Sequence, residues 1–492
     1  MRDALAKYWV IVPVTLLAAG LGWAYGGTRV DCLSWVPWLS LAILEMLLFL
    51  PPLRRGETMA DARARVRYAL TRDPLSYVGI ALCAYLLFQC LNGGRDLMFD
   101  PDTTSWVFSP APVSWGPFCV DPSDARPVLF WFPAALAVAL GIRHGSNRRG
   151  KLVLLRVLVA NGGLLGTFGL IQNLSDATKL FWMTPVQGSF FASFAYPNHA
   201  GAFFTLLFAI NLGLLLQALL SKEDRHHAVW LGVALLMNLT GACLSCSWAA
   251  ILTSLGLVVF GGIYALRHAW SLIDAGKRLK AVSVYIGVLV LGIGFLFFAA
   301  PENPILRELE KMPWSNPVGE MAGRRWPQTA AAFHIWRHHP WFGVGACGAR
   351  RYVSLKAYEN RPIFSQTWGD NVRNDPMQFL AEHGIVGFGL MLGAAVLLFI
   401  PFCRRLWHAH ETQSLGRTGS GSLFLRLSPI AVTLFVGVLL IAAYSLIDLP
   451  FRSPAVLVMW VAALACAPAF LPVPRGQELS GSVAGGEAGR KQ

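Results

Sequence analysis

The polar side chains that could do chemistry are concentrated in one stretch, Gly323 to Leu390, of a chain that is otherwise nearly all apolar. This stretch contains several Arg, four His, the sequence Gly343-Val-Gly345 and the pair Asn374-Asp375. Guanidinium groups bind phosphate oxygens through paired hydrogen bonds and stay charged at any relevant pH. A carboxylate or a His can take the proton of a reacting hydroxyl group. Together these residue types predict a site that holds a phosphate-containing substrate and moves a proton.

We predict that several Arg residues of this stretch bind the phosphate groups of a substrate. Arg324 and Arg325 stand at the start of a helix-like run that ends at His338-His339-Pro340, and Arg373 directly precedes Asn374. The full set of predicted substrate-binding residues is Arg324, Arg325, Arg373, Asn198, Asn374 and Arg452. Three other Arg residues of the stretch have a simpler interpretation, which is that they solvate a loop and touch lipid headgroups: Arg350, Arg351 and Arg361.

The predicted catalytic residues are Asp375, Glu382 and His338, because each could act as a general base toward a hydroxyl group. An alternative for Glu382 is that it only complements the dipole of the helix that follows it. Gly343 and Gly345 are expected to permit a tight turn rather than to cradle phosphate.

Two flanking segments also have structural alternatives. Asn198 follows Tyr196-Pro197 at the start of an apolar run, where it could simply cap a helix. Asp448 and Arg452 lie in one short turn, where they could form a structural ion pair.

The elements that must position these residues are membrane-spanning helices. The chain of 492 residues is 55% hydrophobic and only 14% charged, with a mean hydropathy of +0.50. Its apolar runs are about 16–22 residues long, the length that crosses a hydrocarbon core. Lipid offers backbone groups no hydrogen-bond partners, and strand-like alternation is absent, so the spans must be helices. We predict an all-α polytopic membrane protein with about 12 transmembrane helices.

The net charge of +14 does not indicate nucleic-acid binding. Most Lys and Arg residues lie in short loops beside helix ends, as in the segments Leu53 to Asp73 and Arg143 to Lys151, and this is the distribution of the positive-inside rule. The rule predicts that both termini lie inside and that Gly323 to Leu390 belongs to a long, partly helical outer loop. The cysteines leave a Cys32–Cys119 disulfide open, but their spacing does not select it.

The predicted spans divide the chain into four parts. Residues 1–300 hold spans 1 to 9, residues 301–384 form the outer loop with the active site, residues 385–472 hold spans 10 to 12, and residues 473–492 form a disordered inner tail.

Several motifs together resemble the conserved block of the O-antigen ligase and polymerase family. They are Tyr196-Pro-Asn198-His-Ala200, His338-His-Pro340-Trp-Phe-Gly343-Val-Gly345, Asn374-Asp-Pro-Met-Gln378 with Glu382-His-Gly384, and Asp448-Leu-Pro450, in that order. The resemblance extends over roughly Phe190 to Pro454.

The resemblance implies a metal-independent, inverting glycosyltransferase without a cofactor, in the inner membrane of a bacterium and active on its periplasmic face. Its donor would be a glycan on an undecaprenyl-diphosphate carrier, and its acceptor a sugar hydroxyl on lipid A–core or on a growing glycan. The first acceptor would make the protein a ligase and the second a polymerase.

Two positions depart from the family's pattern. Arg373 stands where the family usually has a His before Asn-Asp, and Ser247-Trp248 stands where it usually has Ser-Arg. Arginine stays protonated and cannot act as a base. Three interpretations follow: Arg373 is a further diphosphate ligand with Asp375 or Glu382 as the base, His338 or His339 folds back to serve, or the activity has drifted. A transporter of lipid-linked sugars and a catalytically silent relative are the rival functions.

Overall fold

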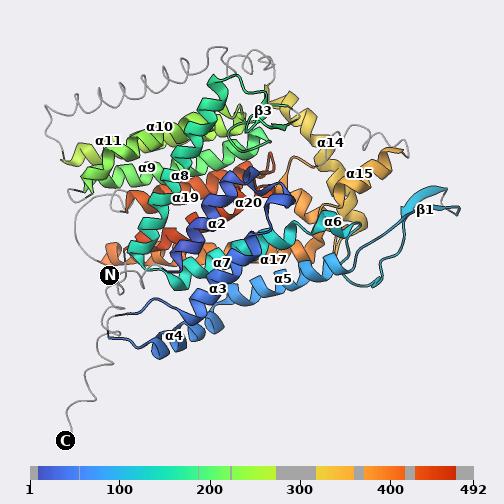
Figure 1. Cartoon of the computed structure of the whole chain (residues 1–492), viewed down its shortest axis with the longest axis horizontal. Coiled ribbons are helices and arrows are strands. Elements are labelled where there is room, and N and C mark those ends of the chain that lie inside the picture. Colours follow the sequence, from blue (N-terminus) through green and yellow to red (C-terminus); the bar gives the residue numbers. More distant parts are fainter. Residues whose placement is uncertain are drawn as a thin grey trace, which may run out of the picture.

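The computed structural model describes residues 9–54, 56–102, 104–186, 188–221, 224–272, 317–358, 371–415 and 427–472. These residues fold mainly into helices, which pack into one bundle (Figure 1). The helices are α2 (Ile11–Trp23), α3 (Val36–Phe49), α4 (Met59–Arg72), α5 (Pro74–Leu91), α6 (Pro122–Ala125), α7 (Val128–Gly145), α8 (Arg148–Leu174), α9 (Pro197–Leu220), α10 (Ala228–Leu244), α11 (Trp248–Leu272), α14 (Pro317–His338), α15 (Ala349–Tyr358), α17 (Asp375–Leu415), α19 (Pro429–Tyr444) and α20 (Pro454–Cys466).

Two helices form the centre of the bundle. Every residue of α20 is buried, and α9 is buried along most of its length between α8, α10, α19 and α20. A helix that neighbours enclose on all sides needs no polar face. The sequence of α20 is accordingly apolar all round, and that of α9 is apolar except for a few residues such as Thr205 and Asn211. The long arm of α17 and α11 are far more exposed, as expected of helices that face lipid.

The helix lengths support a multi-pass membrane protein. Seven helices of the described part are long and apolar enough to cross a membrane, and four shorter apolar helices accompany them: α2, α3, α19 and α20. These eleven correspond to predicted spans, whereas predicted span 9 (residues 281–300) lies outside the described residues. The count of about 12 spans therefore stays a prediction. The predicted tail, residues 473–492, also lies outside the described part.

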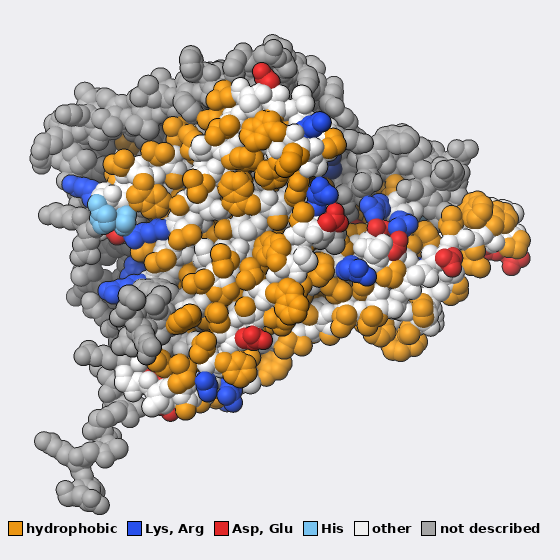
Figure 2. Space-filling model, viewed as in Figure 1, with side chains coloured by type: hydrophobic (Ala, Val, Ile, Leu, Met, Phe, Trp, Pro, Cys, Tyr) orange, Lys and Arg blue, Asp and Glu red, His pale blue; other side chains and the backbone are white. Residues whose placement is uncertain are grey.

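Lys and Arg side chains are visible at both ends of the bundle (Figure 2), and we call the end that holds Arg143 and Arg156 the basic end. There Arg143 pairs with Asp73 at 2.8 Å, and Arg156 pairs with Asp224 at 2.6 Å. The basic segment between Leu53 and Asp73 contains the helix α4, and a capping box at Thr58 starts it.

Two small hairpins that the sequence analysis did not predict lie in the loops at the opposite end. Strands β1 (Leu97–Asp100) and β2 (Ser105–Phe108) pair antiparallel, and so do β3 (Lys179–Leu180) and β4 (Thr184–Pro185). Strands of two to four residues carry too few alternating positions for a period to be visible in the sequence. All nine cysteines are free, so the Cys32–Cys119 disulfide is not formed.

The polar stretch packs against α17. Helix α14 ends at His338, where the sequence predicts the end of a helix, and a turn with positive φ at Gly343 (67°) and Gly345 (91°) leads toward α15. The Gly345 amide donates to the carbonyl oxygen of Glu382 at 2.8 Å, and a Cβ at Gly343 would lie 2.4 Å from the carbonyl carbon of Glu382. The two glycines thus allow a tight turn that lies directly on the α17 backbone.

That contact coincides with a break in α17. Gly384 has φ 61° and ψ −170°, a conformation that is essentially restricted to glycine. It divides α17 into a short arm (residues 375–383) and a long arm (residues 385–415). The Ile385 amide donates to the carbonyl oxygen of Pro340 at 2.9 Å, so the turn after α14 replaces a hydrogen bond that the break removes. We call the end of the bundle with the short arm the site end.

Candidate functional site

Three segments that are far apart in the sequence meet at the site end: the start of α9, the short arm of α17, and the turn between α19 and α20. The Asp375 amide donates to the carbonyl oxygens of Ser445 (2.9 Å) and Asp448 (3.2 Å). The backbone amide of Phe451 in turn donates to Asp375 Oδ2 at 2.7 Å. On the third side, His199 Nε2 lies 3.0 Å from the carbonyl oxygen of Leu449. These contacts fix the three segments relative to one another.

Asp448 is the centre of a buried polar cluster. The Tyr196 hydroxyl donates to Asp448 Oδ1 at 3.1 Å, and Asn198 Nδ2 donates to Asp448 Oδ2 at 2.6 Å. Burial raises the pKa of Tyr196, the charge of Asp448 raises it further, and the charge of Arg373 acts in the opposite direction. Tyr196 is therefore a neutral hydrogen-bond donor at neutral pH. The helix-cap alternative for Asn198 is wrong, because Tyr196 is the N-cap of α9 and no side chain caps this helix.

The hairpin between α10 and α11 also reaches this cluster. Tyr444 donates its hydroxyl to the carbonyl oxygen of Asn198 at 3.3 Å, and the Ser247 hydroxyl lies 2.6 Å from the Tyr444 oxygen. Ser247, at the hairpin tip where the family pattern departs, therefore supports the backbone of Asn198 through Tyr444.

Asp375 is fully buried, and only one of its carboxylate oxygens has a hydrogen-bond partner among the described residues. Its Oδ1 atom has none. A buried acceptor without a partner costs free energy, so such an atom calls for an explanation. A hydroxyl group of a substrate would satisfy it.

Glu382 has a different environment, although it lies on the same face of the short arm. Its Oε1 accepts from Gln378 Nε2 at 2.9 Å, and its Oε2 forms an ion pair with Arg452. The side chain of Glu382 is fully buried and that of Arg452 is 5% exposed. Burial would lower the pKa of Arg452, but the charge of Glu382 outweighs this effect and raises it. Both carboxylate oxygens of Glu382 are therefore engaged.

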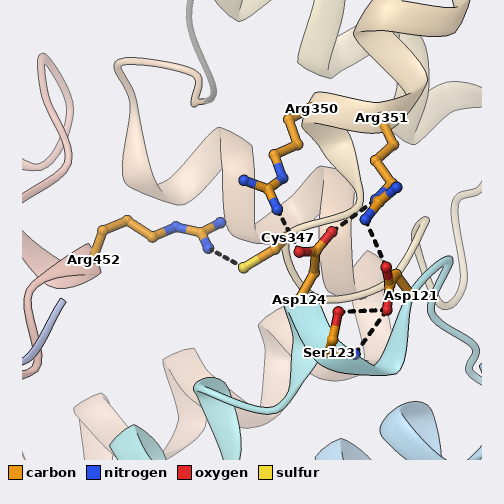
Figure 3. Close-up of polar contacts among 7 residues, drawn as sticks. All are labelled: Asp121, Ser123, Asp124, Cys347, Arg350, Arg351 and Arg452. Carbon is orange, nitrogen blue, oxygen red and sulfur yellow. Dashed lines mark hydrogen bonds and ion pairs between the residues drawn. The ribbon is translucent and has the colours of Figure 1, made fainter. Parts of the chain in front are cut away.

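Arg452 has two further contacts. Its Nη1 lies 3.5 Å from Cys347 Sγ, and Figure 3 draws this contact. Its guanidinium group lies over the ring of Phe379. The sequence offered a local ion pair between Asp448 and Arg452, but Arg452 pairs with Glu382 instead, and it lies in the interior rather than on an open surface.

Arg373 is exposed beside this interior cluster. Its charge acts on Tyr196, and its backbone amide donates to the side chain of Gln328 on α14 at 3.3 Å. Arg324 and Arg325 precede Gln328 by four and three positions on α14. Positions with this spacing share one face of a helix, so the backbone places all three Arg positions near the same junction.

The remaining predicted residues lie farther from this cluster or serve its backbone. Asn374 caps the short arm, because its Oδ1 accepts from the Met377 amide at 3.0 Å. His338 is exposed at the end of α14, and its ring lies 4.6 Å from that of His334. His339 is partly buried against Phe118, and burial lowers its pKa to about 4.

Arg350 and Arg351 do more than solvate the loop. Figure 3 shows both guanidinium groups directed at Asp124 on α6, and Arg351 also lies 2.7 Å from Asp121. These pairs join α15 to the loop before α7. Arg361 lies outside the described residues. No group of three or more His, Cys, Asp or Glu in the described part could hold a metal ion.

Sequence reasoning missed two residues of the cluster. Tyr196 was noted only as part of a motif, yet its hydroxyl binds Asp448. Gln378 too was named only within a motif. It lies four positions before Glu382 and therefore on the same helix face, and this spacing was the available signal.

The apolar helices form a bundle typical of a multi-pass membrane protein. Buried acids, the buried Arg452 and the exposed Arg373 form a polar site at one end of this bundle. Residues 231–392 match the model of a protein family described as O-antigen ligase. This match covers a third of the chain and supports membership of the O-antigen ligase and polymerase family. The matched part includes the short arm of α17, whereas the segments of Asn198 and Asp448 lie outside it. A search of the curated proteins found no match.

Proposed function

We propose that the protein transfers a glycan from an undecaprenyl-diphosphate carrier to a sugar hydroxyl group. The family match supports a ligase- or polymerase-type reaction. The observation that carries the proposal is the unpartnered Oδ1 atom of Asp375, which lies in a buried cluster that the exposed Arg373 adjoins. An acceptor for a proton next to a cation for a leaving group is the minimal requirement of such a transfer.

Each residue has a separate role in this reaction. The acceptor oxygen attacks the anomeric carbon of the donor sugar, the bond from that carbon to the diphosphate breaks, and the diphosphate leaves on its lipid. Asp375 in its ionised form accepts the hydroxyl proton on Oδ1. Arg373, together with the Arg324 and Arg325 positions, holds the negative charge that develops on the diphosphate.

Glu382 and Arg452 have a positioning role in this proposal, which revises the expectation that Glu382 is a base and that Arg452 contacts substrate. The ion pair occupies both charges inside the protein, so neither is free for a ligand. It connects the short arm to the turn that donates to Asp375 and thereby fixes the proposed base. His338 remains a second candidate for the base, and its ring lies 4.6 Å from that of His334 on the same helix.

The proposed topology follows from the charge distribution. The basic end faces the cytoplasm and the site end faces the periplasm, with both termini inside the cell. The loop of residues 301–384 then carries Arg324 and Arg325 to the periplasmic surface, between the helical parts 1–300 and 385–472. A diphosphate at this surface can be bound while its lipid tail stays in the bilayer.

Transfer by the purified protein tests the proposal. The protein in detergent is mixed with the lipid-linked glycan of its source strain and with either lipid A–core or a second lipid-linked glycan as acceptor. Asp375→Asn is expected to lower kcat by about 10²–10⁴-fold with little change in KM, since it removes only proton transfer. Asp31→Asn, at an exposed acid in an outer turn, is the matched control. The acceptor that is consumed distinguishes ligase from polymerase. Full activity of Asp375→Asn would refute the assignment of the base, and no product with either acceptor would refute the function.

A further inference from the structure

A cavity of about 280 Å³ lies at the site end, apart from the cluster around Asp375. The last two turns of α8 form one wall, and the loop that leads into α9 forms the other. Its lining residues are Gly169, Gln172, Asn173, Ala177, Thr178 and the segment Gly188–Ala192. This volume suits one sugar ring rather than a chain of sugars, and it lies near the lower limit of ligand pockets in proteins.

The two walls are fixed to each other. Gln172 is buried, and in the amide orientation that satisfies both neighbours it donates to the carbonyl oxygen of Ala192 (2.8 Å) and accepts from the amide of Phe181 (2.9 Å). A Cβ at Gly169 would lie 2.6 Å from the Phe191 ring, so the loop lies directly on α8. The cavity is therefore formed before any ligand binds, which reduces the entropy cost of binding.

The chemistry of the lining selects a neutral, hydroxyl-rich ligand. None of the lining residues carries a charge, in contrast to the Arg-rich junction at Arg373, so a diphosphate would find no counter-charge there. Among the described residues, the side chains of Asn173, Thr178 and Ser189 make no hydrogen bond with the protein. An amide and two hydroxyl groups both donate and accept, as sugar hydroxyls require. Phe190 adds an apolar surface for the C–H face of a sugar ring.

The cavity is linked to the proposed active site through the chain. The loop that forms its wall continues within a few residues into Tyr196 and Asn198, which bind Asp448. A short bridge between Phe191 and Phe194 makes that connection compact. A ligand in the cavity therefore lies on the same loop as the residues that organise the cluster.

We propose that this cavity binds one neutral sugar unit of the glycan, away from the sugar that reacts. The inference rests on the proposed function, because it assigns the cavity to the same glycan. It gives the protein a contact with the saccharide that does not depend on the diphosphate, and it makes the cavity a determinant of which glycan is accepted.

Binding of a carrier-free saccharide tests this inference. The probe is the neutral oligosaccharide that mild acid releases from the lipid-linked glycan of the source strain, and saturation-transfer NMR on the protein in detergent measures its Kd. The combined variant Asn173→Leu, Thr178→Val and Ser189→Ala is expected to weaken binding by about tenfold or more, since three hydrogen bonds are lost. Ser34→Ala, at an exposed residue of another turn at the same end, should leave Kd unchanged.

Two outcomes would overturn the inference: no saturation transfer to the oligosaccharide with the unaltered protein, or the same Kd for the combined variant. If the combined variant does not elute as a monodisperse protein, the single near-isosteric change Thr178→Val replaces it and should weaken binding severalfold. Asp375→Asn should bind the oligosaccharide as the unaltered protein does. Binding in a protein that transfers no glycan would refute the proposed function alone, whereas transfer without binding would refute the cavity alone.

Discussion

The buried ion pair between Glu382 and Arg452 gives the sharpest quantitative prediction. Arg452→Met keeps the length and apolar volume of the side chain but leaves the carboxylate of Glu382 without its counter-charge. Gln378 then remains as its hydrogen-bond donor. Glu382→Gln removes the negative charge and leaves Arg452 without its counter-charge. The double variant, Arg452→Met with Glu382→Gln, removes both charges.

The expected magnitudes follow from burial. Breaking a buried pair by removal of one partner costs about 3–5 kcal/mol, because a charge without compensation remains in the interior. Replacement of both partners by residues of similar size is often nearly neutral, because the desolvation penalty of both ions disappears as well. We therefore expect Arg452→Met to be about 3–5 kcal/mol less stable than the unaltered protein. The double variant should recover at least about 2 kcal/mol of that loss.

The assay is thermal unfolding in one detergent, followed by the fraction of protein that stays monodisperse on size exclusion. Arg29→Met is the matched control, since Arg29 pairs with Asp31 at an exposed position and its loss should not change the midpoint. The order expected is unaltered protein, double variant, then Arg452→Met. Should the double variant unfold at the same temperature as Arg452→Met, the penalty would not arise from an uncompensated charge, and the positioning role of the pair would have to be abandoned.

Three further predictions address other residues. Gly384→Ala should prevent accumulation of folded protein, because a Cβ there would lie 2.3 Å from backbone atoms of the adjoining turn. Gly389 has open space around it, so Gly389→Ala should be tolerated. The yield after solubilisation measures both effects, and equal yields would contradict the break in α17. Burial lowers the pKa of His339 to about 4, from an unfolded value near 6.5. The protein should therefore be fully stable above pH 6.5 and should lose about 3 kcal/mol of stability as the pH falls toward 4. Limited proteolysis between pH 7 and 4.5 should show this loss, and His339→Phe should lessen it. Asn198 Nδ2 lies 2.6 Å from Asp448 Oδ2, so Asn198→Asp would place a second carboxylate against Asp448. As the pH rises and both acids ionise, their repulsion should lower kcat. A pH dependence of kcat parallel to that of the unaltered protein would argue against this contact.

Much of the helical framework was predictable because the length of an apolar run is a local property. The apolar run after Tyr196 forms α9, which begins at Pro197, and the helix-like run before Pro340 forms α14, which ends at His338. Proline, serine and charged residues near the ends of a helix set its boundaries, and they are close to those ends in the sequence.

The partners within the site were less predictable, because they depend on distant segments. The sequence identified Asp375, Glu382 and Arg452 as candidates but could not show that Arg452 pairs with Glu382, 70 positions away along the chain, rather than with its neighbour Asp448. It also gave no sign that Gly384 interrupts a helix. A glycine at the start of an apolar run fits the end of a loop equally well, and only the turn at Gly343 lying against this backbone requires the break.

The break at Gly384 also sets the rotational phase of the side chains that precede it. Asp375, Gln378 and Glu382 are spaced by three and four positions, so one added or deleted residue among them would turn the following side chains by about 100° about the helix axis. Glu382 would then point away from Arg452, while the same change beyond Gly384 would turn only the later side chains of the long arm and leave this pair in place. Length variation in this helix is thus confined to one side of a single glycine.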